Sequence, residues 1–145
     1  MTTLYDVPPA ELIEGLKTEL KKESSVKPPE WAAFVKTGAD KQKAPEQEDW
    51  WYARSASILC KLYKSGGPIG IQRLKRRYAG KKNRGHKPDK NRGASGAVIK
   101  HILVQLEGAG LAQKTKRGRI ITKEGTSLLD KTSHKIKRSA EKTKK

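Results

Sequence analysis

The sequence predicts a mainly α (α+β) protein: a winged helix-turn-helix core with a small β-hairpin wing and extra N-terminal helices. Apolar residues recur at helical spacing in several segments, and glycine or proline separates these segments. Two short strand-like runs flank a turn at 116–118. From residue 50 onward the predicted order is helix, helix, helix, hairpin, helix. That order is typical of a winged helix-turn-helix.

The length of 145 residues is that of one domain with tails. We expect one winged-helix-type domain over 1–138, with N-terminal helices in 8–36 packed on a core at 49–138. A basic, disordered tail is expected at 139–145. Only 34% of residues are hydrophobic, so composition alone leaves disorder open, whereas the periodic apolar positions argue for a folded centre. The single cysteine, Cys60, excludes an internal disulfide and a multi-cysteine zinc site.

The N-terminal third predicts two helices and a loop. A narrow apolar stripe predicts a helix over 9–22, formed by Leu12, Ile13, Leu16 and Leu20. Prolines suit its start, because the first helical turn leaves its N–H groups unpaired in any case. After Lys27-Pro28-Pro29, a short helix carries Trp31, Phe34 and Val35. The polar stretch 37–48 predicts a loop.

The first two core helices each combine an apolar side with a basic one. Asp49 is a suitable N-cap for a helix from Trp50 to about Lys64. The apolar side of this helix carries Trp51, Ile58, Leu59, Leu62 and Tyr63, and the other side carries Trp50, Arg54, Ser57, Lys61 and Lys64. A helix over 69–78 then buries Ile71, Leu74 and Tyr78 and directs Arg73, Arg76 and Arg77 outward.

The remaining elements follow from glycine, apolar and capping signals. Residues 79–93 are rich in glycine, asparagine and basic residues and predict a loop. A helix over 95–107 has an apolar face formed by Val98, Ile99, Ile102, Leu103 and Leu106, with Ala97, Lys100, His101 and Val104 opposite. The wing follows, with a basic tip. Thr122 can cap a last helix whose inner side carries Leu128, Leu129, Thr132 and Ile136.

Charge indicates a polyanionic partner. Residues 1–50 hold seven Lys against ten Asp and Glu, whereas residues 51–145 hold 26 Lys and Arg against five acids. The formal net charge of the whole chain is +18. A membrane-surface protein would favour one amphipathic basic helix, but here the charge recurs in three separate segments. Nucleic acid fits better, because basic side chains that neutralise phosphates release condensed counterions.

The candidate nucleic-acid contacts combine the basic faces, the loop and the wing tip. They are Trp50, Arg54, Ser57, Lys61, Arg73, Arg76, Arg77, Lys81, Lys82, Arg84, His86, Arg92, Ser95, Lys100, His101, Lys116 and Arg117. Each has a plainer alternative. Trp50 half-buried against the preceding loop, with Arg54 supporting the fold, is as well supported as base stacking. The small residues at 93–97 suit either close phosphate approach or tight helix packing. A basic hairpin tip is also common as plain solvated surface.

The basic segment 79–93 favours RNA over DNA. An ordinary helix-turn-helix joins its helices by three or four residues, and about fifteen intervene here. Such a segment would crowd a major groove but could enter an irregular RNA surface. No catalytic site, metal site or cofactor is predicted. In particular, Gly66-Gly67-Pro68-Ile69-Gly70 lacks the lysine and spacing of a phosphate loop.

Several motifs together resemble the archaeal and eukaryotic small-subunit ribosomal protein family nineteen (S19e). They are Pro28-Pro29-Glu30-Trp31, Asp49-Trp50-Trp51-Tyr52-Ala53-Arg54-Ser55-Ala56-Ser57, Gly66-Gly67-Pro68-Ile69-Gly70, Tyr78-Ala79-Gly80, Arg92-Gly93-Ala94-Ser95, Leu103-Val104-Gln105-Leu106-Glu107 and Thr122-Lys123-Glu124-Gly125. The resemblance covers residues 5–130. The loop with Asn83-Arg84-Gly85-His86 looks archaeal.

The resemblance implies a structural protein of the small-subunit head that binds the 3′ major domain of the rRNA and is needed for subunit maturation. It would place Trp50, Arg54, Arg84, Arg92, Lys100 and His101 on the RNA. Cys60 stands where some relatives have a basic residue, so we leave it out of the site. Expected partners are small-subunit rRNA and neighbouring small-subunit ribosomal proteins. No membrane or small-molecule substrate is expected, and the free protein should be a cytoplasmic monomer. The alternatives are a DNA-binding winged-helix regulator and an assembly factor that leaves the mature particle.

Overall fold

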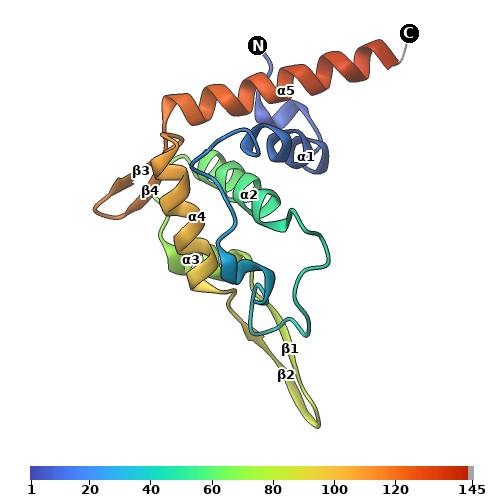
Figure 1. Ribbon diagram of the computed structural model, residues 1–145, viewed down its shortest axis with the longest axis vertical. Coiled ribbons are helices and arrows are strands. Elements are labelled where there is room, and N and C mark those ends of the chain that lie inside the picture. Colours follow the sequence, from blue (N-terminus) through green and yellow to red (C-terminus); the bar gives the residue numbers. More distant parts are fainter. Residues whose placement is uncertain (144–145) are drawn as a thin grey trace.

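The computed structural model describes residues 1–143. The elements in chain order are η1 (Leu4–Asp6), α1 (Pro9–Leu20), η2 (Glu30–Ala33), α2 (Trp50–Ser65), α3 (Ile71–Arg77), β1 (Gly80–Arg84), β2 (Lys87–Arg92), α4 (Gly96–Gly108), β3 (Ala112–Thr115), β4 (Gly118–Ile121) and α5 (Lys123–Thr143). The predicted mainly α class with a small β wing is confirmed. Figure 1 shows α5 crossing the body above α1, while the two hairpins leave the body in different directions.

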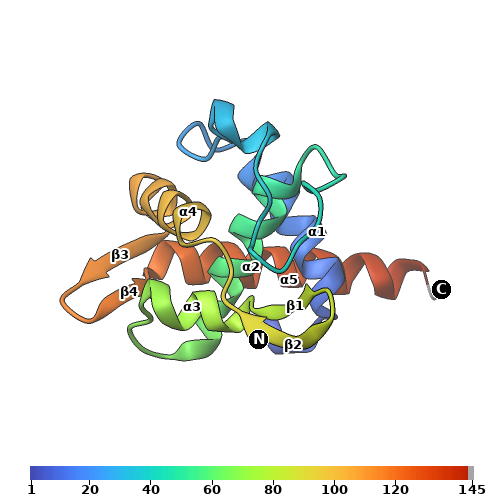
Figure 2. The same cartoon turned by 90° about the horizontal axis from the view of Figure 1, so that it is seen from below.

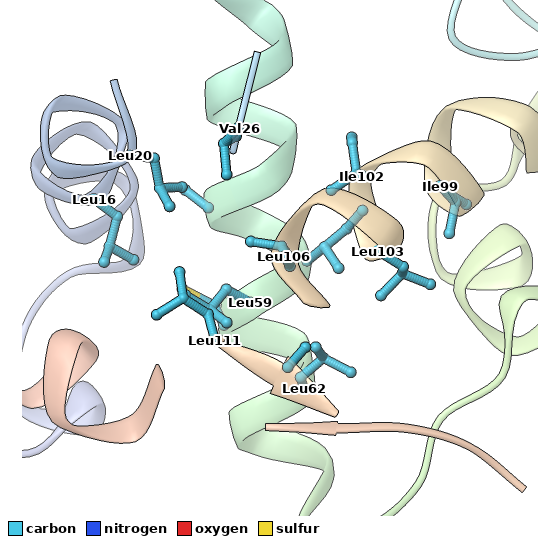
Figure 3. Packing of buried hydrophobic residues seen from close by; sticks show 14 of the residues in the cluster. Leu16, Leu20, Val26, Leu59, Leu62, Ile99, Ile102, Leu103, Leu106 and Leu111 are labelled. Atoms are coloured by element: carbon cyan, nitrogen blue, oxygen red, sulfur yellow. The ribbon is translucent and has the colours of Figure 1, made fainter. Parts of the chain in front are cut away.

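Helix α2 forms the centre of the core. Figure 3 shows Leu16 and Leu20 of α1 on one side of α2, and Ile102 and Leu106 of α4 on the other. All four side chains are fully buried, and each such burial contributes about 1.5–3 kcal/mol. The apolar stripes predicted for α1, α2 and α4 therefore pack against one another in a single cluster.

The two ends of α2 are determined in different ways. Asp49 occupies the N-cap position as predicted, but its side chain makes no capping hydrogen bond. Its carboxylate instead pairs with the amines of Lys17 and Lys21 on α1, at 3.1 and 3.0 Å. At the other end Gly66 has φ +63°, the left-handed conformation that commonly terminates helices.

The wing forms as predicted and is tied to the core helices. β3 and β4 pair in register from Ala112↔Ile121 to Thr115↔Gly118. An isolated bridge pairs Ile69 with Arg119, so the wing also contacts the segment before α3. In Figure 2 the wing extends from the body beside α3 and α4. Thr122 caps α5 as predicted, because its Oγ1 accepts a hydrogen bond from the Gly125 amide at 3.1 Å.

The prediction of a loop over 79–93 is wrong, because β1 and β2 form an antiparallel hairpin there. Its turn follows ordinary chemistry: Gly85 has φ +72° and its amide donates to Asn83 Oδ1 at 2.9 Å. Apart from Gly80, every residue of both strands is exposed. The alternating apolar pattern that usually identifies a strand therefore never arises in this segment.

The prediction of a disordered tail is also wrong over 139–143, because α5 continues to Thr143. The segment contains no glycine or proline, and its alanine, lysine and glutamate are favourable helix residues. Upstream, α5 is held to α1 by an ion pair between Lys135 and Glu19 at 3.0 Å. Residues 144–145 of the predicted tail lie outside the described residues. No helix within 1–143 is both long and apolar enough to cross a membrane.

Candidate nucleic-acid interface

One part of the predicted site is built around Tyr78. The guanidinium of Arg54 and the amine of Lys61, both on α2, lie 4.1 and 4.2 Å from the centre of its ring. The Tyr78 hydroxyl and Ser57 Oγ are 2.7 Å apart and share a hydrogen bond. Spacing places Arg54, Ser57 and Lys61 on one face of α2, and Tyr78, directly after α3, brings them together.

Neither cation of this cluster forms an ion pair within residues 1–143. Burial lowers the pKa of the Arg54 guanidinium, and Tyr78 and Asp40 offset only part of that effect. Burial also lowers the pKa of Lys61, and the positive charges of Arg54 and Arg77 lower it further. Burial raises the pKa of the Tyr78 hydroxyl, which therefore stays neutral at pH 7. An anion at this face would relieve the repulsion between the cations.

Trp50 is half-buried at the start of α2. Its ring meets the ring of Trp51 edge to face, with 5.3 Å between centres. It lines a surface hollow together with Arg54, Tyr78 and the loop residue Pro45. The Trp50 ring thus contacts a core tryptophan and lines the same hollow as the preceding loop, so stacking and packing against the loop both stay open.

A second cationic surface connects α3 to the wing. Arg73 and Arg76 are exposed on α3 and line an open groove with Arg117 of the wing turn. Lys116 beside it is exposed. Arg119 differs, because its Nε donates to Glu107 Oε1 at 2.7 Å. The wing tip therefore offers free cations, whereas its base is tied to α4.

The hairpin β1–β2 carries the third group. Lys81, Lys82, Arg84, His86 and Arg92 are all exposed on it, and it projects away from the helical body (Figure 1). The structure therefore separates these side chains from the Tyr78 cluster and presents them on an arm.

Of the predicted contacts on α4, Lys100 and His101 are exposed, and Ser95 just before the helix is half-buried. Ser95 Oγ accepts the Val98 amide at 3.5 Å, so Ser95 caps the helix. The ring of His101 lies edge to face against Trp31, 5.2 Å between centres. Lys100 is exposed and belongs to no ion pair within 1–143.

Segment 31–38 borders α4 at two places. Trp31 contacts His101, and the Thr37 carbonyl accepts the Ser95 amide at 2.9 Å. Gly38 forms an isolated bridge with Ala94 just before the helix. A recognition helix in a DNA major groove needs free flanks, since the groove is only about 12 Å wide. The bordering segment therefore argues against α4 as a recognition helix in a DNA major groove.

The small residues at the start of α4 lie beneath a lysine. A Cβ atom on Gly96 would stand 3.4 Å from Lys75 Cδ, and one on Gly93 would stand 3.6 Å from Lys75 Cβ. Both distances are ordinary van der Waals contacts, so neither position requires glycine for packing, and both alternatives for these small residues stay open. Sequence reasoning missed Lys75, and it assigned Tyr78 only to the core. A tyrosine at the border of a dense basic block was the available signal. Within 1–143, no group of three or more His, Cys, Asp or Glu could hold a metal ion.

Comparison with known proteins assigns the chain to a family. The family model described as Ribosomal protein S19e matches residues 3–139. The chain is 48% identical to Small ribosomal subunit protein eS19 of Aeropyrum pernix, over 99% of this chain and 95% of that protein. It is 43% identical to the protein of the same name from Thermoplasma volcanium, over 94% of this chain and 90% of the relative. The Haloarcula marismortui protein of that name is also 43% identical, over 92% and 90%. The resemblance drawn from the motifs, including its archaeal type, is confirmed, and this chain belongs to the S19e family of ribosomal proteins.

Proposed function

We propose that this protein is a structural constituent of the small ribosomal subunit, located in its head, where it binds the 3′ major domain of the rRNA and supports subunit assembly. One observation carries the proposal: none of the twelve lysines and arginines of the predicted site forms an ion pair within residues 1–143. These unpaired cations lie on α2, α3, β1, β2, α4 and the wing turn, and such a spread suits a large polyanion. The names of the relatives, small ribosomal subunit proteins, support the same particle.

The contacts would divide by element. The Tyr78 cluster and the α3–wing groove supply phosphate contacts on the body, and the hairpin β1–β2 reaches into an irregular part of the RNA. Trp50 offers part of an aromatic ring for stacking. The protein acts by binding, as a monomer when free, within cytoplasmic ribosomes and beside other small-subunit proteins. It performs no catalysis and requires no cofactor.

Salt dependence and charge reversal test this function together. The logarithm of the association constant for small-subunit rRNA should fall with the logarithm of salt concentration by about 0.7–0.9 per phosphate neutralised. Arg76→Glu should weaken binding and reduce that slope. Lys123→Glu makes the same change of charge at the first turn of α5, outside the proposed surface. It therefore serves as the matched control. Circular dichroism should show the same helical content in both variants.

A sucrose gradient of cell lysate separates this proposal from its alternatives. Persistent co-migration with mature small subunits at high salt is the expected result. A signal confined to immature particles would identify an assembly factor. A signal only at the top of the gradient, or with chromosomal DNA, would contradict the proposal and favour the DNA regulator.

A further inference from the structure

A cavity of about 270 Å³ lies between the N-terminal segment and α2, and it shares Ser57 and Lys61 with the Tyr78 cluster. Its wall is apolar, with Leu4 and Leu12 only 3% and 1% exposed. Pro9, Ile13 and the Cys60 thiol complete that wall. Burial raises the pKa of Cys60 to about 11, so the thiol is uncharged at pH 7 and adds no negative charge.

The cavity is also lined by cations. Lys61, Lys64 and Arg77 contribute to the lining beside Ser57, and among residues 1–143 no Asp or Glu does. Lys64 and Arg77 are exposed. None of the three cations forms an ion pair within residues 1–143. The charges of Arg77 and Lys64 act on Lys61 together with its burial, and all of these lower its pKa. The site therefore combines an apolar wall with positive charges that lack a counterion.

We infer that this cavity binds one unpaired nucleotide of the small-subunit rRNA, with its phosphate on Lys61, Lys64 and Arg77 and its base against the apolar wall. A phosphate alone would satisfy the cations and leave the wall bare. A carboxylate side chain from a neighbouring protein would do the same. The volume falls just below the roughly 300–1,000 Å³ typical of small-molecule sites, which suits a single base. Unpaired, unstacked bases are also what proteins recognise most readily in RNA.

This inference rests on the proposed function and deepens it, because it selects one nucleotide. Two variants alter the cavity in different ways. Cys60→Leu enlarges a wall residue and fills the space, whereas Lys64→Gln removes one exposed cation and leaves the wall intact. Lys131→Gln, an equally exposed lysine on α5 that does not line the cavity, is the matched control.

The readouts are affinity for rRNA containing the 3′ major domain and chemical probing of that rRNA at single-nucleotide resolution. Wild-type protein and Lys131→Gln should protect the same nucleotide, and both cavity variants should leave it reactive. Affinity should fall about tenfold in Cys60→Leu, the effect of losing one stacked base. It should also fall in Lys64→Gln, which loses a phosphate contact. Thermal melting checks folding, and Lys64→Gln retains the test if Cys60→Leu unfolds.

Unchanged affinity and probing in both cavity variants, with Arg76→Glu still weakening binding, would overturn the inference and leave the proposed function intact. If Arg76→Glu also had no effect, the proposed function itself would fail. Loss of a neighbouring protein from reconstituted subunits, with rRNA protection unchanged, would assign the cavity to an acidic protein segment and overturn the nucleotide.

Discussion

The guanidinium of Arg54 lies 4.1 Å from the centre of the Tyr78 ring, and the amine of Lys61 lies 4.2 Å from the same centre. One aromatic ring thus holds two cations that would otherwise repel each other. The ring belongs to the residue that ends α3 and both cations to α2. The contact therefore joins two helices and also orients two of the side chains that we propose to bind RNA.

Replacing Tyr78 should separate its two roles. Tyr78→Phe keeps the ring and loses the hydrogen bond to Ser57, at a cost of about 1 kcal/mol in the free energy of unfolding. Tyr78→Leu also loses both cation–π contacts, each worth about 0.5–1 kcal/mol, and should cost about 2–3 kcal/mol in total. Urea unfolding measures both. Equal stability of the two variants would show that the cation–π contacts contribute nothing to the free energy of unfolding.

Gly118 should tolerate no side chain. Its φ of +149° disfavours other residues, and a Cβ atom there would stand 2.5 Å from the Ile69 carbonyl oxygen. The obstacle is backbone and belongs to the bridge between Ile69 and Arg119, so it cannot rotate away. Gly118→Ala should lower the free energy of unfolding by about 2–4 kcal/mol. Gly67→Ala, where nothing lies within 4 Å, is the control and should change stability by less than about 1 kcal/mol.

The hairpin β1–β2 should become more stable when one residue of a like-charge pair is replaced by a residue of opposite charge. Lys82 stands opposite Lys90 and Arg84 opposite Lys87, and like charges at opposed positions destabilise a hairpin. Lys90→Glu places a carboxylate opposite Lys82 and should slow amide hydrogen exchange over 80–92. The same change should weaken rRNA binding, because it removes a cation from the arm. Lys90→Gln is the control, with a smaller gain in protection. Faster exchange in Lys90→Glu would contradict the prediction.

The contact between α1 and the start of α2 should depend on acid pH. Hydrogen bonds from Lys21 and Lys17 hold the pKa of Asp49 below its ordinary value of 3.8. The folded state therefore binds this proton more weakly than the unfolded state does. The resulting stability is fully present above the unfolded pKa, near 4, and is lost as pH falls through the lower folded pKa.

Asp49→Asn tests that assignment. The variant should be less stable than wild type at pH 7, and the difference should shrink as pH falls below about 4, where wild-type Asp49 also becomes neutral. Urea unfolding at several pH values gives both curves. A difference independent of pH would show that the carboxylate contributes no charge-dependent stability.

Local patterns predicted most of the helices, and the features that they missed have separate causes. The stripes of α1 and α4 are buried as expected because apolar periodicity survives in any fold with a core. The hairpin β1–β2 was missed because both of its faces meet solvent, so its sequence carries no alternation. The side chain of Asp49 makes no capping bond because two lysines of α1, distant in sequence, pair with its carboxylate.

The sequence by itself determined the mainly α class, the wing, the basic faces and the family, because helical periodicity, turn chemistry, charge and motifs are properties of short segments. Only the tertiary structure decided that Tyr78 joins Arg54 to Lys61, that segment 31–38 borders α4, and that an apolar cavity opens beneath three cations. These features depend on how elements distant in the sequence pack together. The directions of their side chains follow from the whole core and not from any one segment.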